Sequence, residues 1–229
     1  MKGPLFYAKI LLFGEYGIIK DSKGLSIPYN FYRGALKLSA EGEFEDSHQK
    51  LVAFSDYLRQ LPETIVRFDW EHLQADIDQK MYFDSSIPQG YGVGSSGALV
   101  AAIYDQYALD KITVLENLTK EKLQQLKQIF SAMESFFHGK SSGLDPLNSY
   151  LSLPILIHSK DSIEPTGLPS QNPEGKGAVF LLDSGIVGET APMVSIFMKN
   201  MEQEPFRLMM KEQFIGYTDH CGDDFVSGD

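Results

Sequence analysis

The feature that most constrains this chain is a glycine-rich segment, PQGYGVGSSGA, at residues 88–98. It holds four glycines and runs directly into a helical pattern, ALVAAIYDQYAL. Glycines allow a close backbone approach and positive φ angles, and the first turn of a helix presents unpaired N–H groups. The segment therefore indicates an anion-binding loop ahead of a helix. The alternative is a flexible turn with Ser95 as a plain N-cap.

The pattern outside this segment predicts a mixture of strands and helices. Residues 5–13 are apolar on both faces, as in strands that lie inside covered sheets. Residues 120–138 carry a helical apolar stripe, and Gly139 follows as a stop signal. Strand-like segments are expected over 24–45 and a helix at 48–61, which Pro62 stops. The stretch at 64–83 is ambiguous, and a strand followed by a turn is one interpretation. Further strands are expected at 153–159 and 178–183, and helices from 192 to 217.

A loop rich in proline and glycine, at residues 165–177, divides the chain. We place the domain boundary within it, which gives domains at 1–173 and 174–229. The second part offers one clear strand, which is too few for an independent domain of strands and helices. We therefore expect the second domain to be incomplete.

Composition limits the classes of function. The chain has 229 residues, of which 43% are hydrophobic and 22% charged, the balance of an ordinary soluble globular protein. Its net charge of −11 disfavours nonspecific binding to nucleic acid or to an anionic membrane. Cys221 is the single cysteine, and no apolar run approaches about 18 residues. We expect a cytoplasmic protein with no nucleic-acid or membrane partner.

A lysine interrupts the apolar N-terminal strand. Lys9 shares its strand face with Leu11 and Phe13, which is an unusual place for a charge. One interpretation is that Lys9 lies at an exposed strand end and extends its ammonium group to water. The other is that Lys9 has a functional role.

Two carboxylates stand out after the glycine segment. Glu134 falls at the edge of an apolar stripe formed by Leu123, Leu126, Phe130, Met133 and Phe137, where a carboxylate needs a partner. It is either a boundary residue paired with a cation or a metal ligand. Asp145 lies in SSGLDPLN, where Asp-Pro is typical of a turn or of a helix start.

Three segments together resemble the GHMP kinase superfamily, and most of all its mevalonate kinases. The glycine segment is similar to the family's second motif, Pro-x-x-x-Gly-Leu-Gly-Ser-Ser-small-small, with Val93 in place of leucine. YAKILLFGEYGII resembles the first motif, A-x-G-K-x-x-L-F-G-E-H, with Tyr16 in place of the usual histidine. SSGLDP resembles the segment of the catalytic aspartate. In mevalonate kinases a magnesium-binding glutamate precedes that aspartate by eleven residues, as Glu134 precedes Asp145.

The resemblance implies an α+β GHMP kinase fold. This fold combines a ribosomal-S5-like N-terminal α/β domain with a ferredoxin-like C-terminal domain, here incomplete, and places the active site between them. ATP and Mg²⁺ are the implied cofactors. The residues implied to bind the nucleotide phosphates are Pro88, Gly90, Gly92, Gly94, Ser95, Ser96 and Gly97.

The resemblance also implies a role for each candidate side chain. Asp145 would accept the proton of a substrate hydroxyl, and Lys9 would steady Asp145 and offset developing charge. Ser96 and Glu134 would supply oxygen ligands to Mg²⁺. The implied substrate contacts are Glu15 and Tyr16.

The family's third motif, K-x-(S/T/C)-G-x-G-G-G, has no match after Gly188. We therefore expect this chain alone to be a poor or inactive enzyme of marginal stability, through loss of a C-terminal part or through divergence. The leading function is ATP-dependent phosphorylation of a small-molecule alcohol, mevalonate first. Alternatives are phosphomevalonate kinase, which Tyr16 favours, another GHMP small-molecule kinase, or a nucleotide-binding protein that no longer catalyses. Homodimer formation is left open.

Overall fold

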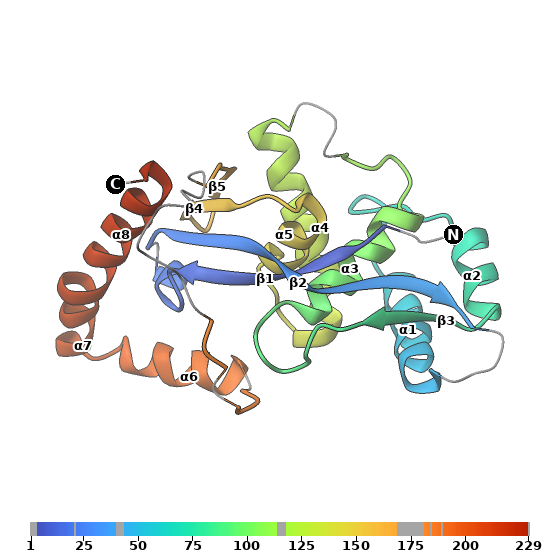
Figure 1. The fold of residues 1–229 in the computed structure, drawn as a ribbon, viewed down its shortest axis with the longest axis horizontal. Coiled ribbons are helices and arrows are strands. Elements are labelled where there is room, and N and C mark those ends of the chain that lie inside the picture. Colours follow the sequence, from blue (N-terminus) through green and yellow to red (C-terminus); the bar gives the residue numbers. More distant parts are fainter. Residues whose placement is uncertain are drawn as a thin grey trace, which may run out of the picture. The chain divides into compact units, whose positions relative to one another are not determined.

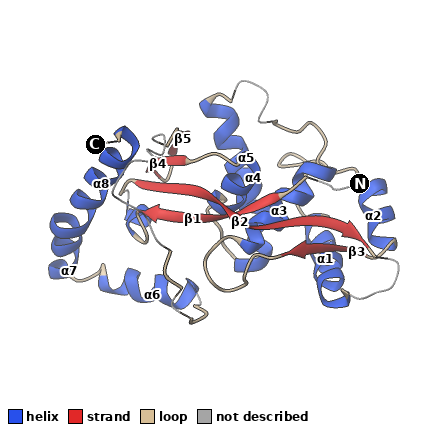
Figure 2. Ribbon diagram, viewed as in Figure 1, coloured by secondary structure: helices blue, strands red, loops and turns tan. Residues whose placement is uncertain are grey.

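The computed structural model describes residues 4–20, 22–39, 44–113, 118–168, 181–183, 185–188 and 190–228. Helices combine with antiparallel strands, which confirms the expected α+β class (Figure 2). The chain divides into two compact units, each assembled from separate stretches of sequence. The first unit is Met1–Ile10, Pro28–Pro88 and Val93–Ser152, and the second unit is Leu11–Ile27, Gln89–Gly92 and Leu153–Asp229.

Hydrogen bonds join the strands in the order β1-β2-β4-β5, and β3 also pairs with β2. The strands are β1 (Phe6–Phe13), β2 (Gly24–Leu38), β3 (Met81–Ser85), β4 (Ile155–Ser159) and β5 (Ser162–Pro165). Within the first unit β2 runs antiparallel to β3, with Leu38 opposite Met81. Within the second unit β2 runs antiparallel to β4, with Gly24 opposite Ile157. The long strand β2 therefore supplies residues to both units.

The core of the first unit lies among three packed helices (Figure 1). Its helices are α1 (Glu45–Leu58), α2 (Trp70–Asp78), α3 (Ser95–Tyr107), α4 (Lys120–His138) and α5 (Leu144–Leu151). Helix α3 is buried on nearly every side, as expected for a helix with no polar face. The rings of Tyr104, Phe130 and Tyr150 meet edge to face at centroid distances of 5.0 to 5.5 Å, one from each of α3, α4 and α5. These contacts fix the helices that carry the candidate site.

The sequence pattern predicted helix α4 correctly and missed helix α2. Helix α4 spans Lys120–His138, and Gly139 with φ 69° ends it, so that prediction is confirmed. The interpretation of residues 64–83 as a strand and a turn is wrong, because the stretch holds α2 and the start of β3. The side chain of Asp69 caps α2 by accepting from the backbone N–H of His72 at 3.1 Å.

The second unit contains the C-terminal helices. They are α6 (Thr190–Asn200), α7 (Glu204–Met209), a π-helical turn at Met210–Ile215 and α8 (Gly216–Ser227), and a short 3-10 helix (Gly17–Lys20) lies in the same unit. The acidic face of α8 binds the segment before β2. Asp219 accepts from the backbone N–H of Lys23 at 2.8 Å, and the Lys23 ammonium pairs with Asp223 at 2.6 Å.

The domain boundary predicted at 173/174 and half of the strand predicted at 178–183 lie outside the described residues. In the described part of the chain after residue 180 the regular elements are helices, so the expected ferredoxin-like strands are not seen there. None of the helices that the structure describes is both long enough and apolar enough to cross a membrane.

Candidate active site

The first unit places Lys9 and Asp145 in direct contact. The Lys9 Nζ atom lies 3.0 Å from Asp145 Oδ1, and the lysine side chain is only 10% exposed. Strand β1 carries Lys9, and the first turn of α5 carries Asp145. A buried ammonium group needs such a partner, so Lys9 does not extend to water at a strand end. An acidic side chain in the first turn of a helix is also favoured by the helix dipole.

Strand β1 also anchors the end of the glycine segment. The backbone N–H of Lys9 donates to the carbonyl oxygen of Val93 at 3.0 Å. Gly94 follows as the N-cap of α3 with φ 81°, in the left-handed region. Lys9 is therefore held by its backbone next to the N-terminus of α3, where free N–H groups favour an anion.

A close approach of two backbones brings Asp145 to the same place. A Cβ atom added at Gly97 would lie 2.7 Å from the carbonyl carbon of Asp145 and 2.7 Å from the nitrogen of Pro146. No side chain fits in that space, so glycine at 97 is what allows the first turns of α3 and α5 to touch.

Glu134 lies on the buried face of α4 and is 3% exposed. Its Oε1 atom accepts from the Ser96 hydroxyl at 3.1 Å, and its Oε2 atom accepts from the Ser141 hydroxyl. The expected partners of this buried carboxylate are therefore two hydroxyl groups, which both donate hydrogen bonds to it. Neither partner is a cation, which separates Glu134 from an ordinary boundary residue in an ion pair.

The environment of Glu134 opposes its ionisation. Burial raises the pKa of Glu134 to about 7, and the negative charge of Asp145 adds to that rise. The hydroxyls of Ser141 and Ser96 and the charge of Lys9 act against it, and they are weaker than burial. A buried carboxylate of this kind is stabilised by a proton or by a bound cation.

The turn between α4 and α5 sets the spacing of the two carboxylates. Gly143 is the N-cap of α5 with φ 74°, and a Cβ atom there would lie 2.2 Å from the carbonyl oxygen of Lys127. Its backbone N–H donates to the Ser141 hydroxyl at 3.0 Å, and the Ser131 hydroxyl donates to the carbonyl oxygen of Ser141 at 2.6 Å. The turn is thereby held against α4, which brings Asp145 back toward Glu134.

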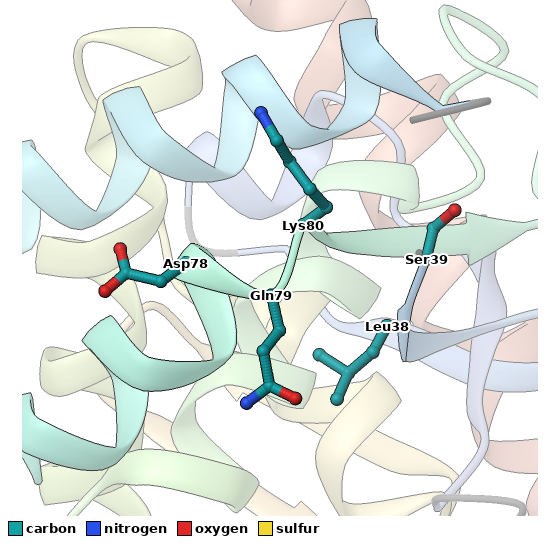
Figure 3. A pocket seen from close by; sticks show the side chains of 5 residues that line it. All are labelled: Leu38, Ser39, Asp78, Gln79 and Lys80. Carbon is teal, nitrogen blue, oxygen red and sulfur yellow. The ribbon is translucent and has the colours of Figure 1, made fainter. Parts of the chain in front are cut away.

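A pocket of the first unit lies away from these residues. It has a volume of about 400 Å³ and lies where β2 ends beside the turn from α2 to β3, lined by Leu38, Ser39, Asp78, Gln79 and Lys80 (Figure 3). The Lys80 side chain extends from it toward Glu45 on α1, with 3.9 Å between the charged atoms. None of the candidate residues lines this pocket.

The glycine segment, Glu134 and Asp145 fall within one match to a protein family. The model of the GHMP kinases N terminal domain matches residues 61–152. Residues 61–152 of this chain are therefore similar to a GHMP kinase N-terminal domain. The match ends before the C-terminal helices and begins after Lys9. No curated protein matches the sequence at a significant level.

Solved structures of three mevalonate kinases are similar to this chain in fold. The mevalonate kinase of L. major in complex with R-mevalonate is 18% identical with a TM-score of 0.60, covering 100% of this chain and 73% of that one. The mevalonate kinase of Methanococcus jannaschii is 14% identical with a TM-score of 0.55, covering 99% and 73%. A third mevalonate kinase structure has 14% identity and a TM-score of 0.52, covering 97% and 72%. At these identities the likeness establishes the GHMP kinase fold.

The region that matches the GHMP kinases N terminal domain contains two residues beside Ser96 and Glu134 that the sequence interpretation missed. His138 Nε2 lies 3.0 Å from the Ser96 hydroxyl oxygen. Ser141 donates to Glu134. His138 follows Glu134 by four residues on α4, a spacing that places both side chains on one helix face. That spacing was the available signal for His138.

Four predicted residues belong to the second unit. Glu15 is exposed, and Tyr16 has φ 58° and stacks on Phe197 at a centroid distance of 5.5 Å. Gly90 accepts from the backbone N–H of Gly188 at 3.0 Å, and Gly92 lies in the same short segment. The substrate role of Glu15 and Tyr16 and the phosphate role of the two glycines stay predictions, as do those of Pro88 and Ser95 in the first unit.

The donor set near α3 fits a magnesium ion that arrives with a nucleotide. The described residues hold no cluster of three or more His, Cys, Asp or Glu side chains that would bind a metal unaided. Magnesium is commonly held by one or two carboxylates together with substrate phosphates and water. Glu134 and Ser96 offer one carboxylate and one hydroxyl oxygen within hydrogen-bond distance of each other.

Proposed function

We propose that this chain is a small-molecule kinase that transfers the γ-phosphoryl group of ATP to an alcohol, with mevalonate as the first acceptor to test. The observation that carries the proposal is the contact of Lys9 with Asp145 beside the N-terminus of α3, with Ser96 and Glu134 joined at the same helix end. The likeness in fold to mevalonate kinases supports the choice of acceptor.

Asp145 is suited to act as the general base. Its side chain is 36% exposed, so an acceptor hydroxyl can reach it. As the acceptor oxygen forms its bond to the γ-phosphorus, the bond from that phosphorus to the β-phosphate oxygen breaks and ADP leaves. The hydroxyl proton passes to Asp145.

Lys9 orients that base and balances its charge. The ammonium group holds one carboxylate oxygen of Asp145, which leaves the other oxygen for the acceptor hydroxyl. It also places a positive charge near the phosphoryl group as negative charge develops there. The backbone of Lys9 is hydrogen-bonded to Val93, which keeps the base of its side chain beside the glycine segment.

The N-terminus of α3 is the proposed place for the phosphates. Its first N–H groups and the Gly94 cap present donors to an anion. Ser96 and Glu134 would hold Mg²⁺, which when bound neutralises phosphate charge. This arrangement lets an acidic protein bind two anionic substrates.

The proposal is tested by ADP release from Mg-ATP by the purified chain, with and without mevalonate. Because the third motif has no match in this chain, we expect slow release in the wild type, which still depends on mevalonate, and a further loss of about 10²- to 10⁴-fold in Asp145→Asn. Asp84→Asn is the matched control, because Asp84 forms an exposed pair with Lys37 in the same unit. Release with phosphomevalonate in place of mevalonate would keep the kinase and change the acceptor. No release with either would contradict the proposal.

A further inference from the structure

The hydroxyl group of Ser96 has two hydrogen-bond partners and one proton. Glu134 Oε1 lies 3.1 Å from the Ser96 oxygen, and His138 Nε2 lies 3.0 Å from it. The Ser96 hydroxyl donates its single proton to Glu134 Oε1. The nitrogen of His138 must then be the donor, which requires the Nε2–H tautomer.

We propose that His138 is a positioning residue that fixes the Ser96 hydroxyl for the metal–nucleotide complex. By donating from Nε2 it occupies one lone pair of the serine oxygen, while the Ser96 hydroxyl donates its hydrogen bond to Glu134. One lone pair of Ser96 is then left for a cation. The role in nucleotide binding rests on the proposed kinase function, whereas the tautomer follows from the direction of the hydrogen bond from Ser96 to Glu134.

The end of α4 is built to keep His138 in this position. His138 is the last residue of the helix, one turn beyond Glu134, and Gly139 ends the helix immediately after it. Both side chains therefore reach Ser96 from the same helix face. The His138 side chain is exposed, unlike that of Glu134, so it orients Ser96 from the solvent side of the site.

The role differs from those of the residues already placed at the site. Lys9 and Asp145 interact with each other, and Glu134 is joined to Ser96 and Ser141. His138 contacts Ser96 and not the reacting groups. Its loss should therefore change binding of metal-bound nucleotide and leave binding of metal-free nucleotide unchanged.

The binding test uses calorimetry on the full chain with Mg-ATP, and with ATP plus EDTA as the metal-free probe. We expect His138→Leu to weaken Mg-ATP binding by roughly 3- to 10-fold, the equivalent of one lost hydrogen bond. His138→Gln keeps an N–H donor and should stay within about 2-fold of wild type. His158→Leu, at an exposed histidine paired with Glu164, is the control. Equal Mg-ATP affinity in wild type and His138→Leu, or an equal loss for metal-free ATP, would overturn the proposal.

A second readout does not depend on nucleotide. Nitrogen-15 NMR of the histidine rings reports which ring nitrogen carries the proton in the nucleotide-free protein. We expect His138 to show the Nε2–H tautomer in wild type and to lose that preference in Ser96→Ala. The Nδ1–H tautomer in wild type would mean that Ser96 donates to His138, and would overturn the inference.

The two readouts distinguish a failure of the proposed kinase function from a failure of the proposed role of His138. A wild-type chain that binds no Mg-ATP would contradict the kinase function and the nucleotide role of His138 with it. A wild-type chain that binds Mg-ATP, with His138→Leu unchanged, would remove only the role of His138.

Discussion

The two compact units hold their candidate residues in different ways. In the first unit, Lys9 and Glu134 are buried, and each has hydrogen-bond or ionic partners from another element. In the second unit, Glu15 is exposed, and Tyr16 is held by a stacked ring. Buried polar groups hold a defined geometry because leaving them unpaired is costly, whereas exposed contacts contribute less. The Lys9–Asp145 and Glu134–Ser96 contacts of the first unit therefore have a defined geometry, whereas the substrate role of Glu15 and Tyr16 in the second unit stays a prediction.

The largest expected difference between the units is that between two lysine–aspartate pairs. Lys9→Met removes the partner of Asp145 and should lower mevalonate-dependent turnover by about 10²-fold or more, because charge develops beside it. Lys23→Met removes the exposed partner of Asp223 in the second unit and should change turnover by less than about 2-fold. Steady-state assays of both variants measure this difference. Equal losses of turnover in Lys9→Met and Lys23→Met would contradict the difference between the two lysine–aspartate pairs.

Glu134 gives the next largest effect, on stability. Its pKa is raised in the folded state to about 7, so folding favours the protonated acid. Its contribution is fully present below the unfolded pKa near 4.5 and is lost as pH rises through about 7. In the absence of Mg²⁺ the free energy of unfolding of wild type should therefore fall relative to Glu134→Gln by up to about 3 kcal/mol over this range. Urea denaturation of both proteins at pH 4.5, 6 and 8 measures it, and parallel curves would contradict the assigned shift.

Two glycines give a smaller and opposite pair of effects on stability. Gly97→Ala places a Cβ atom against the backbone of Asp145 and Pro146 and should lower the free energy of unfolding by about 1 to 3 kcal/mol. Gly222→Ala in α8 meets no atom within 4 Å and should raise it by up to about 1 kcal/mol, because alanine is the better helix former. Thermal and urea unfolding compare the two. A stabilised Gly97→Ala protein would show that α3 and α5 do not touch as described.

The smallest expected effect sharpens the role of the second unit. Phe197→Ala removes the ring that stacks on Tyr16, an interaction of about 1 kcal/mol. If Tyr16 contacts the acceptor, KM for mevalonate should rise by about 3- to 6-fold while the affinity for Mg-ATP stays unchanged. An equal change in both constants would contradict a specific contact of Tyr16 with the acceptor.

The sequence predicted those parts of the fold and site that depend on local pattern. The bounds of α4 follow from its apolar stripe and from Gly139, and the position of Glu134 at the edge of that stripe predicted a carboxylate in need of a partner. Motif resemblance then paired Lys9 with Asp145, which the fold brings to 3.0 Å. Local pattern failed at residues 64–83, where helix α2 begins directly after its N-cap residue Asp69.

Other features depend on contacts between distant residues and were not predictable from pattern. The two units interleave along the chain because β2 pairs with β3 at one end and with β4 at the other. Nothing in a single strand's sequence indicates which distant strand it will meet. The contact of His138 with Ser96 likewise joins residues that are 42 positions apart.

The central claim is that Lys9, Asp145, Ser96 and Glu134 form a phosphoryl-transfer site. Its most direct measurement follows the label from [γ-³²P]ATP with Mg²⁺ and mevalonate in wild type, Asp145→Asn and Asp84→Asn. We predict label on the mevalonate hydroxyl in amounts equal to the ADP formed, in wild type and Asp84→Asn, and almost none in Asp145→Asn. Label found only in inorganic phosphate, or equal transfer by Asp145→Asn, would contradict the account.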